Sequence, residues 1–172
     1  EGVGIYQGGW ESTNYVSASI LVYTGNSTNT FVDMVPELQG TNQPLRYGLS
    51  LKNIGVRAGG LAQTALKIEY AGRAQLDTVS YNEATGTNLY LGQVQFLKME
   101  SCTTSANDSR PALATRAGTG AAISLGSASV DHFSAASTIA NCIFENSTNW
   151  ALVLGPKDKN LTILNGAIES NL

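Results

Sequence analysis

An apolar spacing recurs along the chain and constrains the fold more than any other feature of the sequence. In this pattern an apolar residue at position i is followed by a second apolar residue at i+3 and by a third residue, which is usually apolar, at i+5. First residues of successive matches lie 25, 20, 43 and 25 positions apart. Repeats of this length are typical of solenoids, and the long interval holds either one extra coil or an insertion. The matches are Leu51 with Ile54 and Val56, Leu76 with Val79 and Tyr81, Phe96 with Met99 and Ser101, Ile139 with Cys142 and Phe144, and Leu164 with Ala167 and Glu169.

A second strand pattern lies between these matches. Apolar residues alternate with other residues over a few positions, which is the period of a β-strand. Three of the four segments end in glycine, and we expect this glycine to permit the positive φ of a sharp corner. The segments are Leu66–Tyr70, Leu89–Gly92, Ile123–Gly126 and Leu152–Gly155.

Units of 20–25 residues with two or three short strands cannot bury an apolar face alone, but they can when stacked as coils. Asn82, Asn146 and Asn171 follow the third strand at matching places, where asparagine tolerates a left-handed corner. A β-sandwich is the competing fold, but it favours Asn-Gly hairpin turns, and the single Asn-Gly lies inside the repeat at Asn165. The sequence therefore predicts an all-β fold, a parallel β-helix.

Composition supports extended structure and narrows the partners. Charged residues make up 13% of the chain and hydrophobic residues 42%, which fits neither a disordered chain nor a long-helix protein. A net charge of −3 gives no electrostatic basis for binding nucleic acid or an acidic membrane. No apolar run approaches the ~20 residues needed to span a bilayer.

The repeat also suggests how the chain is organised. We expect residues 1–47 to form irregular N-terminal coils and residues 48–172 to form regular coils, with an insertion or extra coil around 102–120. The first residue is Glu1 and the last residues fall in the middle of a repeat, so we expect a piece of a longer protein. Cys102 and Cys142 form no Cys-x-x-Cys pair, so no zinc site is expected. We interpret them as two buried thiols, with a disulfide as the alternative.

Three segments carry a resemblance to a known family. They are Gly48–Ile54, Thr64–Ile68 and Cys142–Asn146. Together they resemble right-handed parallel β-helix proteins of the pectate-lyase-like superfamily, most closely bacteriophage tailspikes and capsular polysaccharide depolymerases. The likeness extends from about Gly48 to Leu172.

The resemblance implies a function that the residues alone do not establish. It implies a homotrimeric protein of the virion tail, or otherwise a secreted protein, that binds bacterial surface polysaccharide such as capsule or O-antigen. Many such proteins cleave the polysaccharide as glycoside hydrolases or polysaccharide lyases. The sequence contains no pectate-lyase catalytic motif and no calcium-ligand cluster. We therefore expect neither a cofactor nor a metal.

Carboxylates are the candidate catalytic groups, because glycoside hydrolysis uses two of them at a defined separation. Strand alternation places Glu69, Asp77 and Glu100 on the outside of three regular segments, and these are the first candidates. Glu69 and Asp77 lie on different strands, so they need not share one side of the coil. Glu145 and Glu169 are the second candidates, although Glu169 aligns with inward positions elsewhere. For any one of them, a solvated surface carboxylate is the alternative interpretation.

Aromatic side chains are the candidate substrate-binding groups. Tyr70, Tyr90 and Trp150 are expected to bind sugar, with Tyr90 facing outward between Leu89 and Leu91. Burial of these rings at a subunit interface is the alternative. His132, the single histidine, is either a general base or an ordinary surface residue.

The sequence leaves three functions open. The first is a tailspike-type domain that binds and cleaves polysaccharide. The second is a non-catalytic receptor-binding adhesin, and the third is a structural β-helix segment of a trimeric fibre. Converging carboxylates would favour the first, exposed aromatics alone the second, and an apolar outer face the third.

Overall fold

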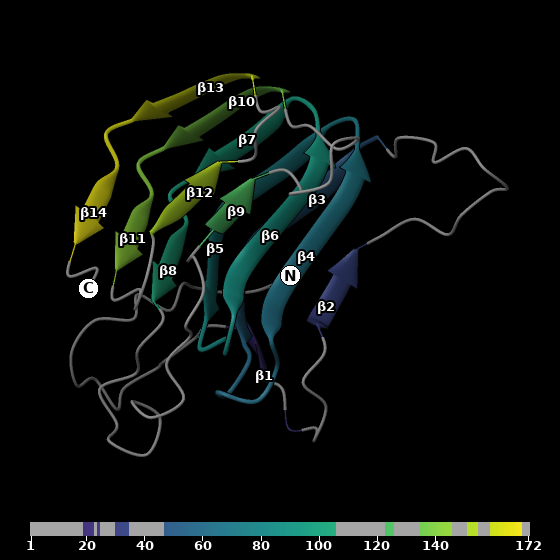
Figure 1. The fold of residues 1–172 in the computed structure, drawn as a ribbon, viewed down its shortest axis with the longest axis vertical. Helices are drawn as coiled ribbons and strands as arrows, with labels where there is room; N and C mark the ends of the chain where they lie inside the picture. The colour runs from purple at the N-terminus through teal and green to yellow at the C-terminus, as the bar shows by residue number, and fades with distance from the viewer. Residues whose placement is uncertain are drawn as a thin grey trace, which may run out of the picture.

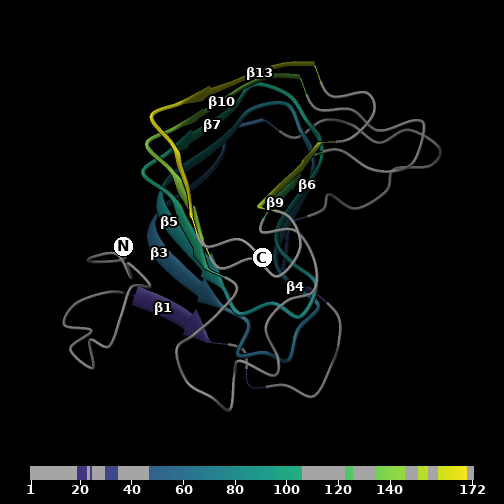
Figure 2. The same cartoon turned by 60° about the vertical axis from the view of Figure 1, so that its left-hand side comes forward.

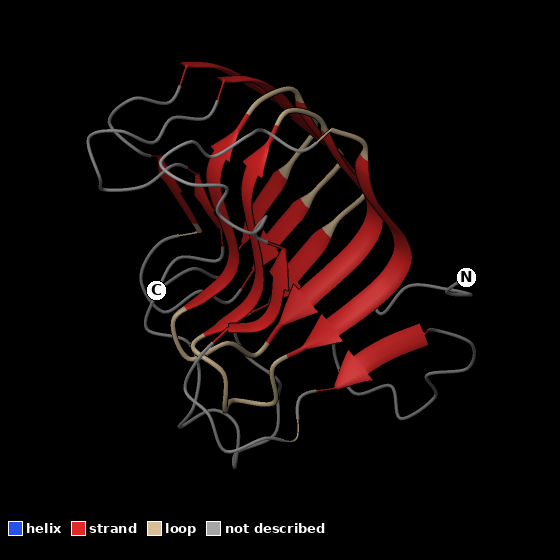
Figure 3. Cartoon of the chain, turned by 90° about the vertical axis from the view of Figure 1, so that its right-hand side faces the viewer, coloured by secondary structure: helices blue, strands red, loops and turns tan. Residues whose placement is uncertain are grey.

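Parallel β-strands dominate the structure, which is a computed structural model. It describes residues 19–22, 24, 30–34, 47–105, 123–125, 135–145, 151–154 and 159–169. Among these residues there is no helix, and all paired strands run parallel, so the predicted all-β parallel β-helix is confirmed (Figure 3). The strands are β1 (Ser19–Val22), β2 (Thr30–Met34), β3 (Leu49–Arg57), β4 (Thr64–Ala71), β5 (Ala74–Asn82), β6 (Thr87–Val94), β7 (Leu97–Glu100), β8 (Thr103–Ser105), β9 (Ile123–Leu125), β10 (Ala135–Ala140), β11 (Ile143–Glu145), β12 (Leu152–Leu154), β13 (Lys159–Leu164) and β14 (Ala167–Glu169).

The strands stack into three faces (Figures 1 and 2). The nine-stranded sheet bends across its middle, and its strands before the bend form face 1: the first halves of β3 and β5, with β7, β10 and β13. Those after the bend form face 2: β1, the second halves of β3 and β5, then β8, β11 and β14. Face 3 is the five-stranded sheet of β2, β4, β6, β9 and β12. Each coil of the chain contributes in turn to the faces, as the predicted stacking requires.

Rows of apolar side chains from successive coils fill the interior. Strand alternation turns every second side chain inward, where it meets its counterpart from the coil below and above. Full burial of one large apolar side chain contributes roughly 1.5–3 kcal/mol, so these rows hold the coils together. The largest members with no solvent exposure are Leu76, Met99 and Ile139 on face 1, Tyr81 and Phe144 on face 2, and Leu66, Ile68, Leu89 and Leu91 on face 3.

The strand register confirms part of the predicted repeat and corrects the rest. Leu51 pairs with Leu76, and all four predicted face 3 segments align as expected. The third match is wrong by three residues, because Met99, and not Phe96, pairs with Leu76. The fifth is wrong by one, because Ile163 pairs with Ile139. Correct matches therefore begin at positions 51, 76, 99, 139 and 163.

The long interval in the repeat is an insertion. Strands β7 and β10 pair directly on face 1, and β8 and β11 pair directly on face 2. The chain between β8 and β10 supplies the single described strand β9, which lies between β6 and β12 on face 3. One coil therefore carries the additional residues, and no further coil separates β7 from β10.

A column of left-handed residues makes the bend between faces 1 and 2. Such a conformation is rare for side chains other than glycine and asparagine, and it recurs here at one register position in five successive coils. The prediction of a left-handed corner at Asn82 is wrong, because positive φ occurs at the next residue, Glu83; Asn146 and Asn171 lie outside the described residues. The column consists of Asn53, Thr78, Ser101, Asn141 and Asn165, with φ between 49° and 61°.

Gly92 serves close packing and not a corner. Its φ is not positive, whereas that of the following residue, Gln93, is 51°. A Cβ atom at position 92 would lie 2.8 Å from Oε1 of Glu69 in the coil below. The expected reason for this glycine was therefore wrong. The counterparts Gly126 and Gly155 lie outside the described residues.

Thr78→Asn is expected to raise the free energy of unfolding by about 1 kcal/mol. Thr78 is the only β-branched member of the column, and a β-branched residue is poorly suited to a φ of 61°. Asparagine already occupies this position in three other coils. Urea unfolding followed by circular dichroism measures the change. Thr87→Asn, in a strand residue without positive φ, is the control and should be neutral or destabilising; an equal gain there would contradict the explanation.

Candidate functional site

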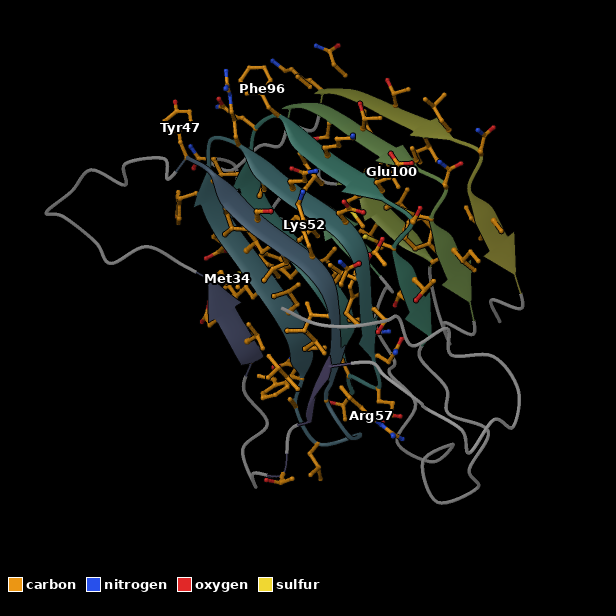
Figure 4. The ribbon with its side chains drawn as sticks, turned by 180° about the vertical axis from the view of Figure 1, so that it is seen from behind. Met34, Tyr47, Lys52, Arg57, Phe96 and Glu100 are labelled. Atoms are coloured by element: carbon orange, nitrogen blue, oxygen red, sulfur yellow. The ribbon has the colours of Figure 1, made fainter. Side chains whose placement is uncertain are left out.

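Three charged side chains form a row on the outside of face 1. Lys52 pairs in register with Asp77, and Asp77 pairs in register with Glu100. Their chain neighbours Leu76 and Met99 point into the core, so the three charged side chains point outward. We call these three residues the carboxylate row. Figure 4 shows Lys52 and Glu100 on the same outer surface.

Two neighbours fix the position of the Asp77 carboxylate. The Thr78 hydroxyl donates a hydrogen bond of 2.9 Å to Oδ1, and the Lys52 ammonium lies 3.9 Å from Oδ2. Thr78 belongs to the left-handed column at the bend, and Lys52 lies one coil away. Contacts from its own coil and from the neighbouring coil therefore orient the carboxylate.

Glu100 is oriented from the opposite side. The side-chain amide of Asn141 donates a hydrogen bond of 2.7 Å to Oε1 of Glu100. Asn141 is the left-handed residue of the next coil, so the same column that bends the sheet also supplies a donor to this carboxylate. Asp77 and Glu100 are thus held by donors from the two flanking coils.

The spacing of the coils sets the spacing of the two strands that carry the carboxylates. Neighbouring strands lie about 4.8 Å apart, and side chains in register leave the sheet in the same direction. Retaining glycosidases hold their two carboxyl groups ~5–5.5 Å apart. The strands that carry Asp77 and Glu100 are therefore spaced at a distance close to this separation. Sequence alignment of Leu51 with Leu76 could have found Lys52, but Asn141 needed the corrected register.

Glu69 lies on another face. It belongs to β4 on face 3, where its carboxylate is 3.1 Å from the Lys67 ammonium. Strand order separates it from the carboxylate row by the core of the coil. Of the three first candidates, the structure thus brings together Asp77 and Glu100 and places Glu69 apart from them.

Two predicted aromatic residues gather around Glu69. The Lys67 ammonium lies 5.9 Å from the centre of the Tyr90 ring, so Tyr90 faces outward as expected. Burial raises the pKa of the Tyr70 phenol, and the negative charge of Glu69 raises it further. Gly92 leaves the space that the Glu69 side chain occupies. Lys67, Glu69, Tyr70 and Tyr90 therefore form a second group, which we call the tyrosine cluster.

The second candidate carboxylates pair in register on face 2. Glu145 of β11 aligns with Glu169 of β14. The alignment of Glu169 with Phe144 in the predicted repeat was wrong by one residue, because Phe144 pairs with Ile168. The side chains of both glutamates lie outside the described residues, as do Trp150 and His132.

The two cysteines are buried free thiols, as interpreted from the sequence. Cys102 and Cys142 occupy matching positions in neighbouring coils, because the residues that follow them, Thr103 and Ile143, pair in register. A hydrogen bond with Cys142, and then burial, raise the pKa of the Cys102 thiol. Within the part of the chain that the structure describes, no His, Cys, Asp and Glu side chains group to hold a metal ion. The same residues include no helix long and apolar enough to cross a membrane.

Comparisons with known proteins add no relative. We compared the chain with protein-family models, with curated proteins and with solved structures, and none of the three gave a match. The parallel β-helix therefore stands on the strand pairing, and the function has to be inferred from the arrangement of the side chains.

Proposed function

We propose that this protein is a polysaccharide-cleaving β-helix of the bacteriophage tailspike type, with Asp77 and Glu100 as its catalytic pair. The observation that carries the proposal is the in-register placement of these carboxylates on neighbouring coils. In this proposal the substrate is a bacterial surface polysaccharide, capsule or O-antigen. The protein works as a homotrimer on the virion tail.

Of the two hydrolytic mechanisms, retention has the carboxyl separation that lies nearer to the spacing of neighbouring strands. Asp77, held by Thr78 and Lys52, attacks the anomeric carbon while Glu100 donates its proton to the leaving glycosidic oxygen. The carbon–oxygen bond breaks and a covalent glycosyl-aspartate forms. Glu100, now ionised, takes a proton from water, and the water oxygen releases the sugar from Asp77. The cycle restores both carboxyl groups and consumes one water.

The surroundings of the pair suit a polysaccharide. Ser50, Gln75, Lys98, Thr138 and Thr162 form a register row beside the carboxylate row, and most of these side chains are uncharged hydrogen-bonding groups. Such groups can meet sugar hydroxyls along several coils. An open, polar strip of this kind accepts an extended chain along the stack more readily than a small compact ligand.

A non-catalytic adhesin is the second candidate function. The tyrosine cluster favours it, because aromatic rings with charged partners bind sugars without any need for paired carboxylates. The two functions use different faces, so the same set of variants separates them.

Asp77→Asn and Glu100→Gln should each lower the rate of polysaccharide cleavage by roughly 10²–10⁴-fold, the usual contribution of such groups. Purified protein is incubated with a panel of capsular and O-antigen polysaccharides. New reducing ends are measured, and unsaturated uronates are detected separately by their absorbance. Binding is followed by affinity electrophoresis and should stay within about threefold. Each variant keeps the shape of its side chain, so folding is expected to be preserved.

Glu69→Gln is the matched control, and it should retain cleavage. Loss of cleavage in this variant, with activity retained in Asp77→Asn, would move the site to face 3. Formation of unsaturated products would show that cleavage proceeds by β-elimination and not by hydrolysis. If the unaltered protein binds a polysaccharide without cleaving it, the adhesin is favoured. If it neither binds nor cleaves any polysaccharide of the panel, the proposal is overturned.

A further inference from the structure

Two large aromatic side chains are exposed at the corner where face 3 leads into face 1. Tyr47 is 69% exposed and Phe96 is 56% exposed. Register places Gly48, Arg73 and Phe96 at one position in three successive coils, just before the paired residues Leu49, Ala74 and Leu97. We call Tyr47, Arg73 and Phe96 the aromatic corner. Figure 4 shows Tyr47 and Phe96 at the same end of the molecule.

The backbone holds Phe96 outward at some energetic cost. Its φ is 56°, a conformation that bulky side chains rarely adopt. Ala136 and Asn160 occupy the same register position in the two later coils and have the same left-handed backbone, but they carry smaller side chains. The exposed ring is therefore not required by the bend, and strained, exposed positions of this kind are associated with function.

The Tyr47 ring is positioned by a glycine in the next coil. A Cβ atom at Gly72 would lie 2.4 Å from the ring, so the ring rests directly over this backbone. Any other residue at position 72 would displace it. The close approach gives Tyr47 a defined place beside Arg73 although most of its surface faces solvent.

The chemistry of the corner fits an acidic sugar. Exposed aromatic surface packs against the apolar face of a sugar ring, and a guanidinium binds a carboxylate through two parallel hydrogen bonds. Arg73 lies between the two aromatic positions along the stack, and the exposed Lys98 follows on β7. The chain as a whole carries a net charge of −3, so this positive charge is local.

The corner is continuous with the carboxylate row. Phe96 precedes Glu100 by four residues and Arg73 precedes Asp77 by four residues. At the rise of an extended strand, four residues span about 13 Å. A polysaccharide seated on the carboxylate pair is therefore within reach of the aromatic corner.

From these observations we propose that Tyr47, Arg73 and Phe96 form a subsite for a uronic-acid unit of the polysaccharide. The subsite rests on the proposed function, since it takes the same substrate and restricts it to acidic polymers. Aromatic stacking supplies contact area to any sugar, and Arg73 selects those that carry a carboxylate. A second copy of the chain is the competing occupant of the corner.

Binding of a uronate-containing polysaccharide and of its carboxyl-reduced form tests the subsite. Arg73→Gln should weaken binding of the acidic polymer about tenfold, the loss expected for one charge-assisted hydrogen-bonding group. It should change binding of the reduced polymer less than twofold. Phe96→Asn, which suits the left-handed backbone, and Gly72→Ala, which displaces the Tyr47 ring, should each weaken binding of both polymers about fivefold.

Ile168→Ala, at an exposed residue of face 2, is the control and should bind both polymers as the unaltered protein does. If the unaltered protein binds and cleaves the acidic polymer and the corner variants bind it equally well, the subsite is overturned while the catalytic proposal stands. Failure of the unaltered protein to bind any polymer overturns both. A fall in assembly mass of Phe96→Asn, with sugar binding intact, would assign the corner to a second copy.

Discussion

Phe144→Ala is expected to lower the free energy of unfolding by about 3–5 kcal/mol, the usual loss for a buried aromatic residue. Phe144 is 0% exposed and lies on β11, with β8 on one side and β14 on the other. Its removal leaves a cavity that neighbouring coils can close only by moving whole strands. Urea unfolding monitored by circular dichroism measures the change.

Ile168→Ala provides the matched control for this prediction. Ile168 occupies the same register row in the next coil but is 57% exposed. Its truncation should therefore cost less than about 1 kcal/mol, since little buried surface is lost. Equal losses at the two positions would contradict the idea that stacking between coils buries this row.

Arg57→Met should be nearly as damaging, with an expected loss of about 3–5 kcal/mol. Its guanidinium lies 2.6 Å from the Glu83 carboxylate, whose side chain is only 4% exposed. Without the guanidinium, a buried negative charge loses this counter-charge. The double variant with Glu83→Leu should recover most of the loss, because both members of the ion pair are then removed together.

An exposed ion pair of the same protein gives the comparison. Lys52→Met removes the ammonium 3.9 Å from Asp77 on the outer surface and should change stability by less than about 1 kcal/mol. Thermal unfolding at one pH provides the measurement for the unaltered protein, Arg57→Met, the double variant and Lys52→Met. If Arg57→Met and Lys52→Met had the same effect, burial would not explain the importance of Arg57.

The repeat could be predicted where only one alignment of the apolar residues fits the spacing. Leu51 and Leu76 have polar neighbours, so alternation identifies the inward residue without ambiguity. Phe96 met the same spacing rule but lies outside, while Leu97 and Met99 point inward. Spacing alone cannot separate an aromatic residue at a corner from one in the core, and the backbone conformation that distinguishes them has no clear signature in the sequence.

The candidate site shows the same division. Alternation along a strand was enough to place Asp77 and Glu100 outside, because it depends on local geometry alone. Their adjacency depends on the register of the third coil, which the sequence pattern placed three residues too early. Glu69 satisfied every local rule as well, yet it lies on face 3, since the angle through which each coil turns was not encoded in the spacing.

In-register stacking also determines which parts of the molecule depend on one another. Each coil contacts only the coil before and the coil after it, so the stability of a strand depends mainly on its two neighbours in the stack. Within the described part of the chain, β5 and β7 each have a paired strand on both sides. Local opening of a more distant coil therefore leaves Asp77 and Glu100 in place. The geometry of the carboxylate pair depends on the strands that flank it and is insulated from movements elsewhere in the stack.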